Sequence, residues 1–263
     1  MSKDLQIIKE LQSKLGESKF GEIKYEAYNN KVIDINLFYK GVKNEDLKLI
    51  GELTNLETLN LGNNKITEIQ GLKKLVNFEW LGLGYNQITK IEGLDSLTNL
   101  QVLNLNRNQI TTMQGLDNLT RLKALNLNYN NISKIEGLEK LANLETLDLS
   151  FNKFTTIQDL KNRTNLKSLY LGHNKITTIQ SLNNFVELKA LNLVNNEISE
   201  INSLENLINL ERHHLDNNQI IRIEGLGKLG KLRVLSLHEN NIPEKEIEQF
   251  ILNNRKTAVA FYH

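Results

Sequence analysis

Histidine and carboxylate residues near the C-terminal end of the sequence are of the types that bind metals. His214 and His238 stand close to Asp216 and Glu239 in neighbouring copies of a repeated pattern. Imidazole and carboxylate groups together suit zinc, and a metal-dependent hydrolase would need such a set. Polar residues scattered over a surface are the simpler interpretation, so we expect no metal, no cofactor and no catalytic residues.

A second set of residues has the types that dominate protein-binding surfaces. Large side chains occupy equivalent positions, 22 residues apart, in the middle of the chain: Tyr85, Arg107, Tyr129, Phe151 and His173. Trp80 and Tyr170 stand nearby, at positions that carry smaller residues in most copies. Aromatic and arginine side chains are favoured at binding hot spots. These seven residues are the candidate partner-binding site; stacking on one another along a sheet is the alternative explanation.

The charge balance and composition exclude several classes of function. The 263 residues include 32 Lys+Arg and 31 Asp+Glu, a formal net charge of +1, which predicts neither a nucleic-acid nor a membrane partner. There are no cysteines, which excludes disulfides and thiolate chemistry. The charged N-terminal stretch lacks the apolar run of a secretory signal, so we expect a cytoplasmic protein. No phosphate-binding glycine loop, H-E-x-x-H or G-x-S-x-G motif is present, and we expect no enzyme.

The elements that must position these residues come from a 22-residue repeat. Asparagines recur with this period at Asn64, Asn86, Asn108, Asn130, Asn152, Asn174, Asn196, Asn218 and Asn240. A leucine stands three residues before each of them, and the whole unit reads L-x-x-L-x-L-x-x-N-x-I-x-x-I-x-x-L-x-x-L-x-x. A unit this short cannot bury its apolar face alone, so stacked copies must bury it against each other.

Alternation within x-L-x-L-x predicts a short strand with its leucines inside and the residues between them facing out. Stacked copies then form a parallel sheet, and the candidate site residues lie on its outer, concave surface. The asparagine stands where the chain leaves the strand, and we expect its amide to bond backbone groups of the turn. The rest of each unit is too short for a regular helix and predicts turns of 3₁₀ type.

This pattern resembles that of the leucine-rich repeat proteins over about residues 37–250. Its 22-residue form is similar to the class typified by a eukaryotic protein-phosphatase regulatory subunit and to the repeat region of bacterial internalins. The resemblance implies an α/β, right-handed solenoid with a curved parallel sheet on the concave face and short 3₁₀ or turn segments on the convex face. It also implies a non-enzymatic module, a scaffold or regulatory subunit, that binds a protein or peptide on the concave face; an internalin-like surface adhesin is the alternative.

The two ends of the chain are expected to close the stack as one domain, residues 1–263, in a monomer. Residues 1–36 form the N-terminal cap, with a helix from Asp4 to Gly16 and a hairpin that turns at Asn29-Asn30. Leu5, Ile8, Leu11 and Leu15 lie on one side of this helix. Residues 59–242 are regular repeats, and residues 243–263 form a C-terminal cap with a helix near Pro243 and a final strand.

Three departures from the repeat carry predictions of their own. Residues 37–58 read as a degenerate first repeat, in which Leu37 matches Leu59 and Val42 replaces the asparagine. His213 replaces a strand leucine, and we expect it to be a buried, neutral packing residue. Arg163 replaces a leucine in the following segment, and we expect its stem to cover apolar surface while its head stays in water.

Overall fold

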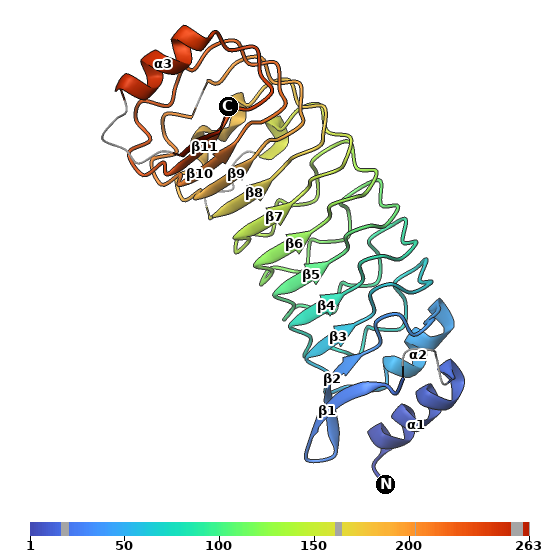
Figure 1. Ribbon diagram of the computed structural model, residues 1–263. Helices are drawn as coiled ribbons and strands as arrows, with labels where there is room; N and C mark the ends of the chain where they lie inside the picture. Colours follow the sequence, from blue (N-terminus) through green and yellow to red (C-terminus); the bar gives the residue numbers. More distant parts are fainter. Residues whose placement is uncertain (17–20, 161–164, 203, 254–259, 263) are drawn as a thin grey trace. The chain divides into compact units, whose positions relative to one another are not determined.

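The computed structural model describes residues 1–16, 21–160, 165–202, 204–253 and 260–262 (Figure 1). By internal contacts the chain divides into two compact units. The first unit contains residues 1–131 and 136–143, and the second contains residues 132–135 and 144–263. In the described ranges, no helix is both long enough and apolar enough to cross a membrane.

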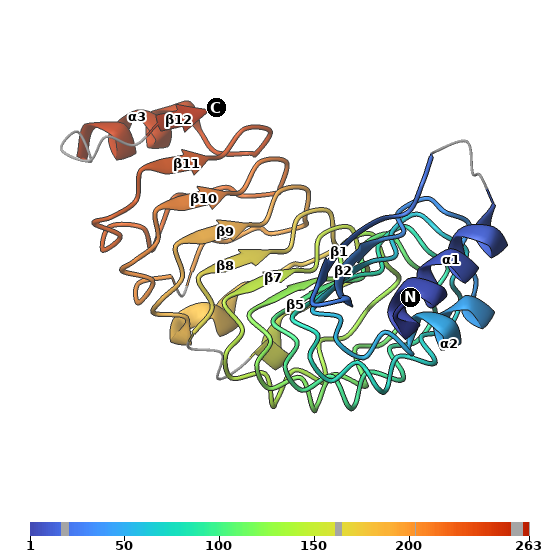
Figure 2. The same cartoon turned by 90° about the horizontal axis from the view of Figure 1, so that it is seen from below.

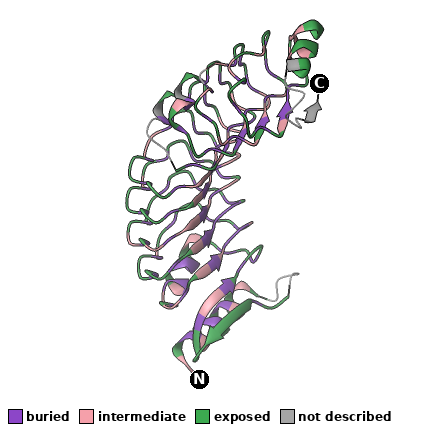
Figure 3. Ribbon diagram, turned by 90° about the vertical axis from the view of Figure 1, so that its left-hand side faces the viewer, coloured by how far each residue is buried: buried purple, intermediate pink, exposed green. Residues whose placement is uncertain are grey.

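The first unit consists of a helix, a hairpin and a ladder of short parallel strands. Its elements are α1 (Lys3–Leu15), β1 (Lys24–Tyr28), β2 (Lys31–Asn36), the 3₁₀ helix η1 (Asn44–Asp46), α2 (Leu47–Ile50), β3 (Thr58–Asn60), β4 (Trp80–Gly82), β5 (Val102–Asn104) and β6 (Ala124–Asn126). β1 and β2 are antiparallel, and β2 to β6 follow one another in parallel. Leu59 and Leu81, opposite each other in β3 and β4, are fully buried, as the repeat predicted. Figure 3 colours the ribbon by burial, and buried residues, in purple, recur along the ladder of strands.

The second unit continues the same repeat and ends in a helix and a strand. Its elements are β7 (Thr146–Asp148), η2 (Gln158–Leu160), β8 (Ser168–Tyr170), η3 (Gln180–Asn184), β9 (Ala190–Asn192), β10 (Arg212–His214), β11 (Val234–Ser236), α3 (Glu244–Asn253) and β12 (Ala260–Tyr262). Neighbouring strands from β7 to β12 are parallel. The predicted solenoid of parallel strands, and the helix and strand at the C-terminal end, are therefore confirmed.

The recurring asparagines form a buried hydrogen-bond ladder, as predicted. Asn86 donates through Nδ2 to the carbonyl oxygens of Leu61 and Leu83, both at 3.0 Å. Its Oδ1 accepts from the N–H of Ile66 at 3.0 Å. Asn196 makes the equivalent bonds in the second unit. One side chain thus satisfies backbone groups of two consecutive repeats, which explains why asparagine recurs at this position.

A second asparagine ladder, which the sequence analysis missed, runs along the turns that precede the strands. Asn99 and Asn143 each donate through Nδ2, at 2.8 Å, to a carbonyl oxygen 23 residues earlier in the chain. Where a repeat has Arg121 instead of asparagine, its guanidinium donates to Oδ1 of Asn99 at 2.6 Å. These side chains are exposed, and their 22-residue spacing was the available signal.

The segments between the strands are mostly turns, with 3₁₀ helices in the described regular repeats only at η2 and η3. The glycines that recur in these segments occupy tight turns. Gly93 has φ +77°, and a Cβ at this position would overlap the carbonyl oxygen of Ile69 in the repeat before. Glycine at position 93 therefore allows the close approach of these two repeats.

The N-terminal cap contains the predicted helix and hairpin. Asn29 and Asn30 have φ +49° and +62°, as a two-residue hairpin turn of type I′ requires. Helix α1 packs against β2 and α2 (Figure 2). Of the four apolar residues on one side of the helix, Ile8 and Leu11 are buried, and Leu5 and Leu15 are half-buried; Asp4 and Ile7 are buried as well. The Asp4 carboxylate accepts the N–H of Val32 at 2.9 Å, so Asp4 lies on the side of the helix that faces β2.

The first repeat is shifted by two residues from the predicted alignment. Ile35, and not Leu37, lies opposite Leu59 in the sheet. Lys40, and not Val42, therefore matches Asn64, whose Oδ1 accepts the N–H groups of both residues at 3.1 and 3.0 Å. The two additional residues lie between β2 and α2, in the segment that contains η1.

Two replaced leucines have different outcomes. His213 is fully buried in β10, and burial lowers the pKa of its imidazole to about 4. It is therefore a neutral core residue at pH 7, as predicted. Arg163 lies outside the described residues.

Candidate partner-binding site

The seven predicted site residues occupy two kinds of position. Trp80 lies on β4 and Tyr170 on β8, and both side chains are half-buried. The other five were predicted to lie on strands, and this prediction is wrong. Each lies three residues after a strand ends, in a left-handed turn with φ between +50° and +57°. We call these five the turn row: Tyr85, Arg107, Tyr129, Phe151 and His173. The outward positions of the strands themselves are called the strand face.

In the first unit, Arg107 lies between two tyrosines. Its guanidinium carbon is 3.9 Å from the ring centroid of Tyr129 and 5.1 Å from that of Tyr85. These are cation–π distances, and they fix the flexible arginine side chain against the two rings. Tyr85 remains 49% exposed, and Arg107 is also exposed. The contact therefore presents a charged group and aromatic surface to solvent.

The backbone of the turn row favours a different residue type. Asn63, Asn195 and Asn217 occupy three of the equivalent positions outside the turn row, with φ between +54° and +55°, and Tyr39 and Glu239 occupy two more. Asparagine adopts the left-handed conformation readily, whereas bulky side chains do so at a cost on the order of 1 kcal/mol or more. Five consecutive repeats nevertheless carry a large ring or arginine here. The backbone alone does not explain this choice.

Trp80 lies flat on the strand face. A Cβ at Gly82 would collide with the indole ring, so the glycine is what allows the ring to lie down. Two other glycines of this surface, Gly84 and Gly172, are approached instead by the Oδ1 atoms of Asn106 and Asn192.

In the second unit, Phe151 and His173 stack on each other. Their ring centroids are 3.8 Å apart, and the rings are inclined by 12°. The Nε2 atom of His173 lies 3.2 Å from Nδ2 of Asn195, and burial lowers the pKa of the imidazole. His173 is therefore neutral at pH 7 and accepts this hydrogen bond through Nε2. The stacking alternative describes part of the arrangement correctly, because neighbours in the row do touch.

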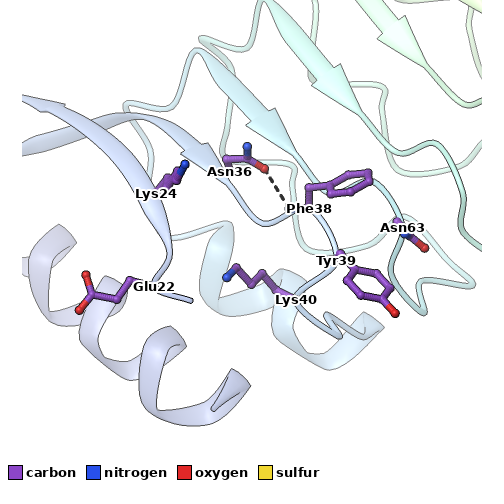
Figure 4. A pocket seen from close by; sticks show the side chains of 7 residues that line it. All are labelled: Glu22, Lys24, Asn36, Phe38, Tyr39, Lys40 and Asn63. Atoms are coloured by element: carbon purple, nitrogen blue, oxygen red, sulfur yellow. Dashed lines mark hydrogen bonds between the residues drawn. The ribbon is translucent and has the colours of Figure 1, made fainter. Parts of the chain in front are cut away.

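Sequence reasoning missed two aromatic residues of the first unit. With the shifted alignment of the first repeat, Tyr39 matches Asn63 and has φ +57°, so it belongs to the same series of turns. The Phe38 ring lies against Gly62. Both rings line a cavity of about 330 Å³ with Asn36, Lys40 and other residues (Figure 4). The 22-residue period did not mark them, because the first repeat is two residues longer than the others.

Comparison with protein families identifies the repeat. The family described as "Leucine Rich repeats (2 copies)" matches residues 76–118 and 120–162. "Leucine rich repeat" matches residues 142–198, and "Leucine Rich Repeat" matches residues 55–75. The chain is a leucine-rich repeat protein. This family is typical of protein–protein interaction modules that are generally not enzymes.

Solved leucine-rich repeat structures share the fold. A Leptospira interrogans protein is 25% identical, with a TM-score of 0.67 over 81% of this chain and 68% of that one. Internalin C2 of Listeria monocytogenes is 25% identical, with a TM-score of 0.63 over 87% of this chain and 91% of that one. A third structure is the ectodomain of the Arabidopsis thaliana receptor kinase GASSHO1/SCHENGEN3 in complex with CASPARIAN STRIP INTEGRITY FACTOR 2. It is 23% identical, with a TM-score of 0.69 over 82% of this chain and 28% of that one. Comparison with curated proteins gave no match.

The histidines and carboxylates of the last repeats do not assemble into a metal site in this leucine-rich repeat protein. Asp216 accepts hydrogen bonds from the Ser236 hydroxyl and, at 3.0 Å, from the N–H of His238. His238 Nε2 lies 3.2 Å from a carboxylate oxygen of Glu239. Across the described part of the chain, no three histidine or carboxylate groups lie close enough together to hold a metal ion. The hydrolase interpretation therefore has no geometric support.

Proposed function

We propose that this protein binds a protein or peptide partner on its strand face, with the turn row as principal contact. The observation that carries the proposal is the choice of residue at the left-handed turns. Asparagine fits this backbone and occupies it in flanking repeats, yet five consecutive repeats carry Tyr, Arg, Phe or His. Residues that are conformationally unfavourable are retained at functional sites, and aromatic and arginine residues are the types that contribute most at interfaces.

The geometry of the rings supports the same function. Arg107 is fixed by Tyr85 and Tyr129, and the Phe151 and His173 rings are stacked. Rings and cations that are already ordered lose little conformational freedom when a partner binds. In the first unit the turn positions adjoin the strand face, because one cavity is lined by Asn36 of β2 and by Tyr39 and Asn63. A partner on this face would touch both.

For the biological setting we propose a scaffold or regulatory subunit in the cytoplasm, because the 22-residue repeat resembles that of the phosphatase regulatory-subunit class. The likeness to internalin C2 favours a second setting, a bacterial surface adhesin. Both are binding functions and use the same surface. Fractionation of the source cells, followed by immunodetection of the protein, distinguishes them.

Affinity capture from native lysate tests the proposed function. The test variant combines Tyr85→Asn, Arg107→Asn and Tyr129→Asn, which installs the residue that flanking repeats already carry at this turn. The control combines Asn99→Ala and Asn143→Ala in the exposed second ladder of the same unit. We expect wild type and control to retain a common partner that the test variant loses. A partner retained equally by all three proteins, or retained by none, would contradict the proposal.

A further inference from the structure

The asparagines of the strand face in the first unit all point their amide nitrogens outward. Oδ1 of Asn60, Asn104 and Asn126 each accepts, at 3.0 Å, the backbone N–H two residues later. Because the backbone donor needs an acceptor, this bond fixes which end of each carboxamide faces the turn. Figure 4 shows the same bond at Asn36, from its oxygen to the N–H of Phe38. Within the described residues, no acceptor of the protein meets the Nδ2 atoms of these asparagines.

Other groups on the same face are donors too. Arg107 is the one charged residue among the outward and turn positions of β3 to β6, a stretch that is described throughout. Its guanidinium faces two rings, and no acceptor among the described residues meets its N–H groups. The indole of Trp80 has a single polar group, which is a donor. From β3 to β6 the surface therefore offers fixed hydrogen-bond donors, one cation and no carboxylate. The neighbouring carboxylate, Asp34 on β2, accepts a hydrogen bond from the Thr58 hydroxyl.

We propose that the strand face of the first unit binds an acidic peptide segment, whose carboxylates accept from Arg107 and from the amides of Asn104 and Asn126. This inference rests on the proposed function and specifies the partner's chemistry. Carboxylate oxygens accept several hydrogen bonds at once and match the planar donor edge of arginine. The rings beside Arg107 provide apolar contact for the rest of the segment.

Nucleic acid fits this surface less well than an acidic peptide. Its phosphates are recognised by clusters of lysine and arginine, whereas β3 to β6 present a single arginine among neutral amides. Neutral amide donors discriminate acceptors without attracting a polyanion. The inference thus commits to carboxylates of a peptide, and nucleic acid becomes an outcome of the test.

The chain itself offers a variant that reverses the chemistry while keeping the fold. Asp148 stands in the same column as Asn104 and Asn126, and its Oδ1 accepts the N–H of Ser150 at 3.0 Å. Aspartate therefore makes the same turn bond as asparagine. The double variant Asn104→Asp/Asn126→Asp replaces two outward NH2 donors with carboxylate oxygens. Asn192→Asp is the matched control, because Asn192 makes the same bond in the second unit.

Fluorescence anisotropy with labelled peptide pools tests the inference on the full chain. Three pools of equal length share aromatic and small residues and differ only in containing Asp/Glu, Asn/Gln or Lys/Arg; single-stranded DNA is a fourth probe. We expect the acidic pool to bind about tenfold more tightly than the amide pool, the worth of one charge-assisted hydrogen bond. Asn104→Asp/Asn126→Asp and Arg107→Gln should each remove this preference, and Asn192→Asp should keep it.

The outcomes separate this inference from the proposed function. Equal binding of the pools, no binding, tighter binding of the basic pool or of DNA, or an unchanged preference in Asn104→Asp/Asn126→Asp would each overturn the acidic-peptide inference. In each of these cases the proposed function would still hold if the affinity-capture experiment shows that the variant with Tyr85→Asn, Arg107→Asn and Tyr129→Asn loses the partner. Circular dichroism of each variant confirms that it folds before its binding is measured.

Discussion

At the scale of single residues, the left-handed turn after each strand is where sequence and backbone disagree. The asparagine ladder, the leucine columns and the turn glycines all have a conformational or packing reason. Tyr85, Arg107 and Tyr129 have none in the backbone, which is the same in repeats that carry asparagine. Contacts between neighbouring side chains offset part of the conformational cost. We propose that the remaining reason is what these side chains offer to a partner.

Replacing Tyr85 tests the conformational argument without any ligand. We expect Tyr85→Asn to leave the free energy of unfolding unchanged or slightly higher, because asparagine accepts φ +57° readily. Tyr85→Val should lower it by about 1 kcal/mol relative to Tyr85→Asn, since a β-branched side chain is strained there. Urea unfolding followed by circular dichroism measures both. A valine variant as stable as the asparagine variant would show that this turn imposes no such preference.

His213 is the residue most at odds with its surroundings. It lies between Leu191 and Leu235 in the sheet, is fully buried, and its Nε2 has no hydrogen-bond partner. Because an unsatisfied buried polar atom costs about 1–3 kcal/mol, we expect His213→Leu to stabilise the protein by that order at pH 7. The outward-facing neighbour gives the control, His214→Leu, which should change little. A lower denaturant midpoint for His213→Leu would contradict this prediction.

The same residue makes stability depend on pH. Burial lowers the pKa of His213 from 6.5 to about 4, so the unfolded chain binds a proton that the folded protein does not bind between these values. Stability from this source is complete above pH 6.5 and falls as pH drops toward 4, by about 3 kcal/mol in all. Unfolding curves of wild type and His213→Leu across this range measure the difference. Parallel pH dependence in the two proteins would exclude the histidine as the cause.

At the scale of the element, period and pattern were sufficient to predict most of the fold. The strands, the asparagine ladder, the type I′ hairpin and both capping helices follow from spacing and residue type. The shift of the first repeat did not, because two inserted residues leave Leu37 in apparent 22-residue alignment with Leu59. The buried face of α1 depends on a tertiary bond between Asp4 and Val32, which apolar periodicity does not reveal.

The two asparagine ladders should differ strongly in their contribution to stability. Asn108 is buried and bonds the carbonyl oxygens of Leu83 and Leu105 and the N–H of Ile88. Asn108→Ala leaves these groups unsatisfied, and we expect a loss of roughly 2–4 kcal/mol. Asn143→Ala removes one exposed bond, to the carbonyl oxygen of Thr120, and should cost less than about 1 kcal/mol. Equal losses in thermal or urea unfolding would contradict the assignment of the buried ladder as structural.

At the scale of the whole molecule, the repeat shows which residues depart from its pattern better than it shows where those residues lie in the structure. The column of large residues was visible in the sequence, because any departure from a strict repeat is visible. That they lie on turns beside the strands, and that Tyr39 belongs to the same series, required the observed alignment of β2 and β3. Which atoms of the asparagines face outward also depended on hydrogen bonds that spacing does not encode.

The most direct test of the central claim is the dissociation constant of the captured partner, measured by calorimetry against two variants. Tyr85→Asn/Arg107→Asn/Tyr129→Asn alters the turn row, and Asn99→Ala/Asn143→Ala alters the exposed ladder away from it. We expect the first variant to weaken binding by about 100-fold or more, as expected for hot-spot residues, and the second to leave it within about threefold. Unchanged affinity in the first variant, or a large loss in the second alone, would contradict a binding role for the turn row.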